Sequence, residues 1–428
     1  MEEIMTLDHI VLGIAIFSIT YLLIVTEKFN RVAVAMTGAA LMMLLSVEKQ
    51  ESAIEHIDFN TIGILIGMMI IVTITRKSGI FEYLAIKSVK AVKGQPWGIL
   101  VLFLIITAVA SALLDNVTTI LLIAPITLVI TDTLKLNPIP FLVPEILMAN
   151  IGGTATLIGD PPNIMIGSAT GLSFMDFLVN LGPVVVVIFI VTLFLLKTIY
   201  KGCYTCEESA RKEILSLDEN LAIKNMALLR KSVIVLVMTM IGFMIHGTFG
   251  LESATIAISG AAVLLFVSKL DPEEIFIEIE WNTIFFFCAL FVLVGGLEEV
   301  GALDYLAEQL VRITNGDVVL LTFIILFVSA IASAFLDNIP FVATMIPLLA
   351  KLGAISGLDM TSVWWALSLG ACLGGNGTLI GASANVIVSG MLEKKGHRLS
   401  FGAYMKVGFP LMLVSIAISA VYLGIFYV

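Results

Sequence analysis

Long apolar runs recur along the whole chain, for example at residues 10–25, 184–196 and 411–428. With their flanks, such runs are long enough to cross about 30 Å of hydrocarbon as helices. The 428 residues are 59% hydrophobic and 13% charged, with a mean hydropathy of +1.08, which is too apolar for a soluble domain. The sequence therefore predicts an all-α polytopic membrane protein. A net charge of −10 argues against nucleic acid as a partner.

The second half of the chain repeats the first. A shift of 222 residues carries SALLDN at 111–116 onto SAFLDN at 333–338, and GGTATLIGDPPN at 152–163 onto GGNGTLIGASAN at 374–385. Internal repeats are characteristic of transporter folds. We expect one repeat over residues 1–200, a cytoplasmic linker over 201–230 and a second repeat over 231–428.

Positive charge predicts that the two repeats face opposite ways. The connection at 76–93 carries five basic residues, whereas its counterpart at 297–317 carries Arg312 alone. Basic loops stay in the cytoplasm, so inverted repeats are expected, with Lys28, Arg31 and the linker inside. This places both termini on the extracytoplasmic side of the cell (inner) membrane.

Each half is expected to contain a re-entrant helical hairpin and a broken transmembrane helix. Residues 101–114 and 117–130, like 323–336 and 339–350, are short for full crossings and flank the repeated LDN motif. The glycine-rich segments 152–159 and 374–381 interrupt crossing helices; after the first, Asp160 is expected to cap the helix that Pro161 restarts. Backbone groups freed at membrane depth need protein or a water-filled cavity to bind them. The pattern predicts an ion and substrate site near the midplane.

The carboxylates at these interruptions indicate cation binding. No Lys or Arg occurs in 98–133 or 318–350. An ionised carboxylate at the bilayer centre costs at least about 2.5 kcal/mol, so each needs a proton, a cation or helix amides. If the coupling ion is sodium, we expect Asp115, Asn116, Asp337 and Asn338 to bind it; no cofactor beyond Na⁺ or H⁺ is expected. The predicted ion and substrate site comprises Asp115, Asn116, Thr118, Gly153, Thr154, Thr156, Asp160, Asn163, Asp337, Asn338, Gly375, Asn376, Thr378, Ser383 and Asn385.

Structural alternatives stay open for several of these residues. In one alternative, Asp115, Asp160 and Asp337 serve as helix caps and have no other role. In another, the glycine pairs 152/153 and 374/375 are helix-packing positions. Other polar residues are expected to lack a role in transport. These are the interfacial Glu145, Glu298 and Glu299, the four histidines (His9, His56, His246 and His397), the incidental thiols Cys203 and Cys206, and the packing residues Cys288 and Cys372.

The motifs LLDNVTTILLIAPIT and GGTATLIGDPPNIMIG, with their counterparts, resemble the ion transporter superfamily, in particular ArsB/NhaD-type permeases of the branch that contains the melanosomal P protein. The resemblance implies two inverted repeats, a homodimer and an elevator mechanism. It places the family's tip signature on residues 115–117 and 337–339. Dicarboxylate carriers of the superfamily have Ser-Asn-Thr there, so this chain departs from them.

The resulting functional hypothesis is a secondary active transporter coupled to sodium or protons, with an inorganic oxyanion such as arsenite as cargo. A sodium/proton antiporter, a di- or tricarboxylate carrier and a passive anion channel remain alternatives. The partners expected are the lipid bilayer, the ion and a second copy of the chain; a separate ATPase subunit stays open. No enzyme is expected. An intramembrane aspartyl protease is disfavoured because LIGD lacks the first glycine of the protease Gly-x-Gly-Asp pattern.

Overall fold

The computed structural model describes residues 2–26, 28–216 and 218–428, and side chains from His9 onward within them. Nine of the helices so described are long and apolar enough to cross a membrane. The helices of the first half are α1 Glu2–Val25, α2 Arg31–Leu44, α3 Gln50–Glu55, α4 Phe59–Arg76, α5 Ile80–Ala91, α6 Pro96–Leu113, α7 Asn116–Thr133, α8 Ile139–Gly153, α9 Pro161–Thr170 and α10 Phe174–Ile199.

The second half has the same succession of helices. Between the halves lie α11 Glu208–Leu215 and the 3-10 helix Glu219–Ala222. The remaining helices are α12 Met226–Phe249, α13 Ser253–Ser268, α14 Pro272–Phe276, α15 Trp281–Glu299, α16 Ala302–Thr314, α17 Val318–Phe335, α18 Asn338–Ser356, α19 Thr361–Gly374, α20 Ser383–Lys394 and α21 Phe401–Phe426. Each helix from α2 to α9 begins 222 residues before its counterpart among α13 to α20. Thus α2 begins at Arg31 and α13 at Ser253, and α9 begins at Pro161 and α20 at Ser383.

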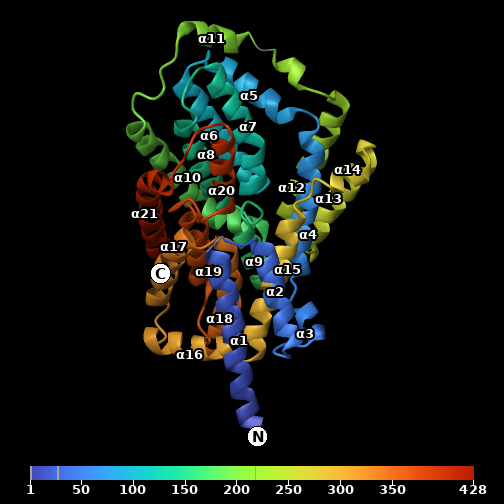
Figure 1. Ribbon diagram of the computed structural model, residues 1–428, viewed down its shortest axis with the longest axis vertical. Helices are drawn as coiled ribbons and strands as arrows, with labels where there is room; N and C mark the ends of the chain where they lie inside the picture. The colour runs from blue at the N-terminus through green and yellow to red at the C-terminus, as the bar shows by residue number, and fades with distance from the viewer. Residues whose placement is uncertain (1, 27, 217) are drawn as a thin grey trace.

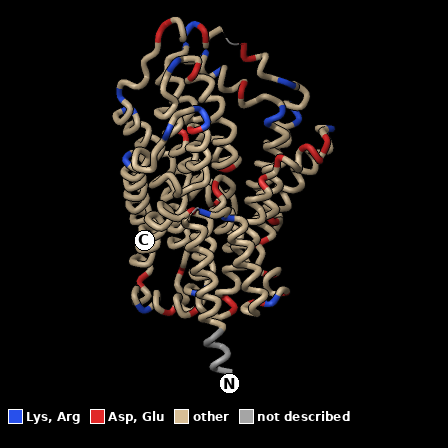
Figure 2. Tube along the Cα trace, in the orientation of Figure 1, with Lys and Arg blue, Asp and Glu red and all other residues tan. Residues whose placement is uncertain are grey.

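The two repeats are inverted, as the charge pattern predicted. The hairpin α6–α7 and helix α5 lie in the upper part of the molecule, whereas α17–α18 and α16 lie in the lower part (Figure 1). The tips of the two hairpins therefore point toward each other from opposite ends. Many charged residues lie toward these two ends, and a further group of both signs lies at mid-height (Figure 2).

The hairpin helices are longer than the sequence predicted. Helices α6 and α7 each have 18 residues. Pro96 begins α6, where its missing N–H removes no helical hydrogen bond. In α7, the hydroxyls of Thr131 and Thr133 donate to carbonyls one turn earlier, at 2.8 and 2.9 Å. The helix therefore continues past the end of the apolar run from which its length was predicted.

Two groups of helices can be distinguished by their packing. In one, α4 packs on α13, α2 on α15, α1 on α2 and α12 on α13; in the other, α17 packs on α19, α6 on α8, α20 on α7 and α18 on α9. We call the first group the scaffold bundle and the second the hairpin bundle. In the hairpin bundle, a Cβ on Gly152 or Gly374 would collide with the backbone of Ala108 or Ala330, so the helix-packing interpretation is confirmed for these two glycines.

Candidate functional site

Both tip aspartates cap the returning helix of their own hairpin. Asp115 accepts hydrogen bonds from the backbone N–H and the hydroxyl of Thr118, at 2.7 and 2.6 Å. Asp337 accepts one from the backbone N–H of Ile339 at 3.2 Å. The alternative interpretation, that these aspartates are helix caps, therefore agrees with the hydrogen bonds that each makes to its own hairpin. For Asp337 it is incomplete, because the second oxygen of this carboxylate has two further partners.

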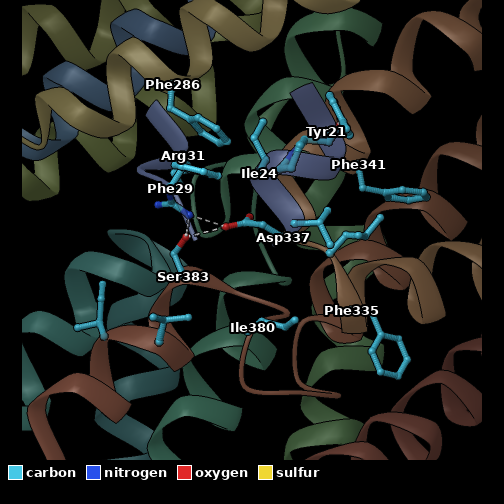
Figure 3. A pocket seen from close by; sticks show the side chains of 15 residues that line it. Tyr21, Ile24, Phe29, Arg31, Phe286, Phe335, Asp337, Phe341, Ile380 and Ser383 are labelled. Atoms are coloured by element: carbon cyan, nitrogen blue, oxygen red, sulfur yellow. Dashed lines mark hydrogen bonds and ion pairs between the residues drawn. The ribbon is translucent and has the colours of Figure 1, made fainter. Parts of the chain in front are cut away.

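Arg31, the first residue of α2, reaches the tip of the second hairpin from the scaffold bundle. Its Nη1 lies 2.8 Å from Asp337 Oδ2 and 2.9 Å from Ser383 Oγ, and Ser383 donates to the same oxygen at 2.9 Å (Figure 3). The expectation that both tips lack a basic partner is therefore wrong for Asp337. The search for basic residues covered only the segments around the two tips. It did not find Arg31, because this side chain comes from α2 of the scaffold bundle.

Asp160 does not cap the helix that follows it. Its side chain makes no capping hydrogen bond, is fully buried, and accepts from Asn338 Nδ2 at 3.2 and 3.4 Å. The predicted cap is wrong because the first two residues of α9 are prolines, which have no N–H, and the N–H of Asn163 bonds to the backbone carbonyl of Asp160 at 2.9 Å. The break of the first repeat is thereby joined directly to the hairpin tip of the second.

A row of buried asparagines begins at the tip of the first hairpin. Asn116 Nδ2 donates to Asn150 Oδ1 at 3.0 Å, and Asn150 Nδ2 donates to Asn376 Oδ1 at 2.9 Å and to Asn385 Oδ1 at 3.1 Å. Asn116 Oδ1 has no hydrogen-bond partner among the described residues. Asn376 completes the row by donating to the carbonyl of Leu147 at 3.2 Å. This network links the first hairpin tip to the second break.

The two breaks are held by equivalent asparagines. Asn163 donates to the carbonyl of Thr156 at 3.0 Å, and Asn385 donates to that of Thr378 at 2.9 Å. The hydroxyls of Thr156 and Thr378 donate in turn to carbonyls near the end of α6 and of α17. These contacts give hydrogen-bond partners to backbone carbonyls that have none within a regular helix, as expected for interrupted helices inside a membrane.

The remaining predicted residues also lie at the breaks. Thr154 donates to the carbonyl of Asn150 at 2.7 Å. A Cβ on Gly153 or Gly375 would meet the carbonyl oxygen of Gly159 or Gly381, across the same break. Only small residues fit at such close approaches.

A small cavity of about 60 Å³ lies where the two bundles meet. It is bordered by Asp115 from one hairpin, Ile339 from the other, and Arg31 and Glu280 from the scaffold bundle. A second cavity of about 260 Å³ is lined by Arg31, Asp337 and Ser383 on its polar side (Figure 3). Arg31 and Ser383 border both cavities, so the two adjoin there. The space is large enough for water or ions, and it brings a guanidinium, hydroxyls and carboxylates together.

Comparison with known proteins identifies the family. The model of the CitMHS family, described as citrate transporter, matches residues 21–370. The chain belongs to this citrate transporter family. It is 42% identical to an uncharacterized transporter of Mycobacterium bovis over 97% of this chain and 98% of that protein, and 39% identical to a 46 kDa membrane protein of Mycobacterium leprae over 97% and 99%.

More distant relatives agree with this assignment. The P protein of Homo sapiens is 34% identical over 98% of this chain, which spans 60% of that protein. The YdaH transporter of Alcanivorax borkumensis has the same fold, with a TM-score of 0.58 and 13% identity over 97% of this chain and 98% of that one. The resemblance to the ion transporter superfamily is confirmed, and the chain is a membrane transporter, not an enzyme.

Two further interpretations need correction. Glu145, expected among the interfacial residues without a role, does not lie on the surface: it is fully buried, its Oε1 accepts from Thr127 at 2.6 Å, and its Oε2 has no partner among the described residues. Cys372 does more than fill space, because its thiol lies 3.4 Å from Asn163 Oδ1, at the position that Asn150 occupies in the first repeat. Glu280 was missed, although it matches Asp58 under the 222-residue shift.

Proposed function

We propose that this chain is a secondary active transporter that couples the movement of a small oxyanion to Na⁺ or H⁺ at the site between the two hairpin tips. The observation that carries this proposal is the excess of carboxyl groups at the site. Asp337 has an ion pair with Arg31, whereas Asp115, Asp160 and Glu280 have none among the described residues. Unpaired ionised carboxylates are too costly at membrane depth, so the site must take up cations or protons.

The chemistry of the surrounding groups suits a hard cation as well as a proton. The carboxylates lie beside amide, hydroxyl and backbone carbonyl oxygens of the breaks, which are the neutral ligands that such cations accept. Asp115, Asn116, Asp337 and Asn338 are the proposed sodium ligands. Occupation by one or more cations would bring the site close to neutrality, and an anion could then bind without facing uncompensated carboxylates.

Arg31 and the beginning of α20 support an oxyanion as cargo. The guanidinium is partly exposed, with 39% of its side chain accessible, and it borders both cavities. Ser383 is the first residue of α20, where free helix amides favour an anion. Arg31 also gives a di- or tricarboxylate a basic partner beside the tip of the second hairpin. We therefore keep a tricarboxylate such as citrate beside an inorganic oxyanion such as arsenite as candidate cargo, and the family's description supports citrate.

The packing is consistent with an elevator mechanism. Polar contacts join the bundles at separate points: Arg31 with Asp337, the hydroxyl of Tyr21 with the carbonyl of Pro340 at 2.7 Å, and Asn60 with Ser168 at 3.1 Å. Contacts of this kind can be exchanged when one rigid body moves along another. We propose that the hairpin bundle moves against the scaffold bundle, within a homodimer in the cell membrane.

Sodium/proton exchange without an anion is the second candidate, because the same excess of carboxylates favours it. Purified protein in liposomes distinguishes the two. Uptake of citrate, arsenite, phosphate and sulfate is measured under an imposed sodium or proton gradient, together with uptake of radioactive sodium.

Accumulation of one oxyanion above its external concentration, abolished when an ionophore dissipates the cation gradient, is the expected result. Sodium uptake in exchange for protons, independent of every anion, would replace oxyanion transport by the antiporter. Anion uptake that only equilibrates would indicate a channel.

A further inference from the structure

Three side chains with metal-ligating atoms meet near α3, away from the hairpin tips. Glu48 precedes α3, His56 follows it, and Glu299 ends α15. One potential ligand atom from each lies within 4.8 Å of the others, and His56 Nδ1 is 2.5 Å from Glu48 Oε1. In Figure 1, α3 lies in the lower part of the molecule, at the end opposite to α5 and α11.

Glu48 is the residue of this cluster that points to a missing ligand. It is 1% exposed, and its Oε2 has no hydrogen-bond partner among the described residues. A buried carboxylate oxygen without a partner is costly. His56 contacts only Oε1 of this carboxylate, so Oε2 is the oxygen that lacks a partner.

The backbone of α15 leaves room for the cluster. A Cβ on Gly295 would collide with the ring of His56 and approach Glu48 Oε1 to 2.8 Å. Gly295 is one turn before Glu299, so both residues lie on the same face of α15. His56 also lines a cavity of about 280 Å³, which gives solutes access to the ring side of the cluster. Glu299 is exposed and supplies a ligand from the solvent side.

We propose that Glu48, His56 and Glu299 form a binding site for a divalent transition metal, with Zn²⁺ as the first candidate. An imidazole favours Zn²⁺ over Mg²⁺ or Ca²⁺, and three protein ligands leave a position for water. The metal would give Glu48 Oε2 its partner and tie the segment around α3 to the end of α15. This site is separate from the tips and does not depend on the proposed transport function.

Metal binding is tested on the purified full chain after removal of metals with EDTA. The exposed Cys203 and the nearby Cys206 could bind Zn²⁺ themselves, so both are first replaced by Ser. In this background, calorimetric titration with Zn²⁺ is expected to give one site per chain. Glu299→Gln and His56→Ala should each weaken binding at least about tenfold, and Zn²⁺ should raise the unfolding temperature of the parent more than that of either variant.

Glu298→Gln is the matched control, because Glu298 is adjacent in sequence but contacts Lys351, and it should bind Zn²⁺ like the parent. Glu299 is exposed, so its amide variant is expected to fold normally even if His56→Ala does not. Absence of Zn²⁺ binding at 100-fold excess metal would overturn the site, as would unchanged affinity in Glu299→Gln.

Discussion

Removal of the Arg31 guanidinium should separate the binding of anion and cation. Arg31→Ala removes a guanidinium that donates to Asp337 at 2.8 Å and to Ser383 at 2.9 Å and that, in the proposed mechanism, donates to the bound oxyanion. A hydrogen bond to a charged group contributes about 1.5–3 kcal/mol. Because 39% of the Arg31 side chain is exposed, solvent screening reduces this contribution. About 1–2 kcal/mol remains, which corresponds to a factor of roughly 5–30 in a binding constant.

The half-saturating concentrations of the oxyanion and of the coupling cation should change in opposite directions. The oxyanion loses its guanidinium contact, so its half-saturating concentration should rise by roughly 5–30-fold. The coupling cation then faces an Asp337 without a competing guanidinium, so its half-saturating concentration should fall. Initial uptake rates in liposomes, measured against each concentration in turn, give both values.

Lys351→Ala provides the control for this variant. Lys351 also lies on α18 and forms an ion pair with Asp304 at 2.9 Å, but it is at the other end of that helix from Asp337. Its removal should change neither half-saturating concentration. If both values are also unchanged in Arg31→Ala, Arg31 is no part of the transport site and the argument for an oxyanion fails.

Two further variants address the break and the packing. Asp160→Asn should flatten the sodium or pH dependence of transport, because it removes a carboxyl without removing a helix cap; initial rates that follow the same profile as the wild type would show that Asp160 binds no coupling ion. Gly374→Ala should lower the unfolding temperature, because its Cβ meets the backbone of Ala330 and overpacking costs about 1–3 kcal/mol, whereas Gly390→Ala, with free space around it, should not. Equal unfolding temperatures would contradict the close packing of α17 on α19.

The repeat made much of the fold predictable. Two copies of LDN and of the glycine-rich break fixed the hairpin tips and interruptions, and loop charge fixed the relative orientation of the halves. These features depend on local sequence and on comparison of the chain with itself. The hairpin helices were predicted too short because apolar runs end before threonines that bond back within the helix.

Contacts between the bundles could not be predicted in the same way. Arg31 looks like an ordinary loop charge in sequence, and only the packing of α2 brings it to Asp337. The partner of Asp160 lies in the other repeat, so its role was mistaken for a cap. Asn150 was overlooked because its counterpart is Cys372, and a search for duplicated polar residues passes over such a pair.

The central claim is that carboxylates at the two hairpin tips couple cation binding to transport. Its most direct measurement is gradient-driven accumulation of the identified oxyanion in liposomes that contain either the wild type or the Asp115→Asn/Asp337→Asn double variant. The substitutions keep side-chain size and the ability to cap a helix, so folding should be retained. The account predicts accumulation above the external concentration for the wild type and its loss in the variant; equal accumulation in both would contradict it.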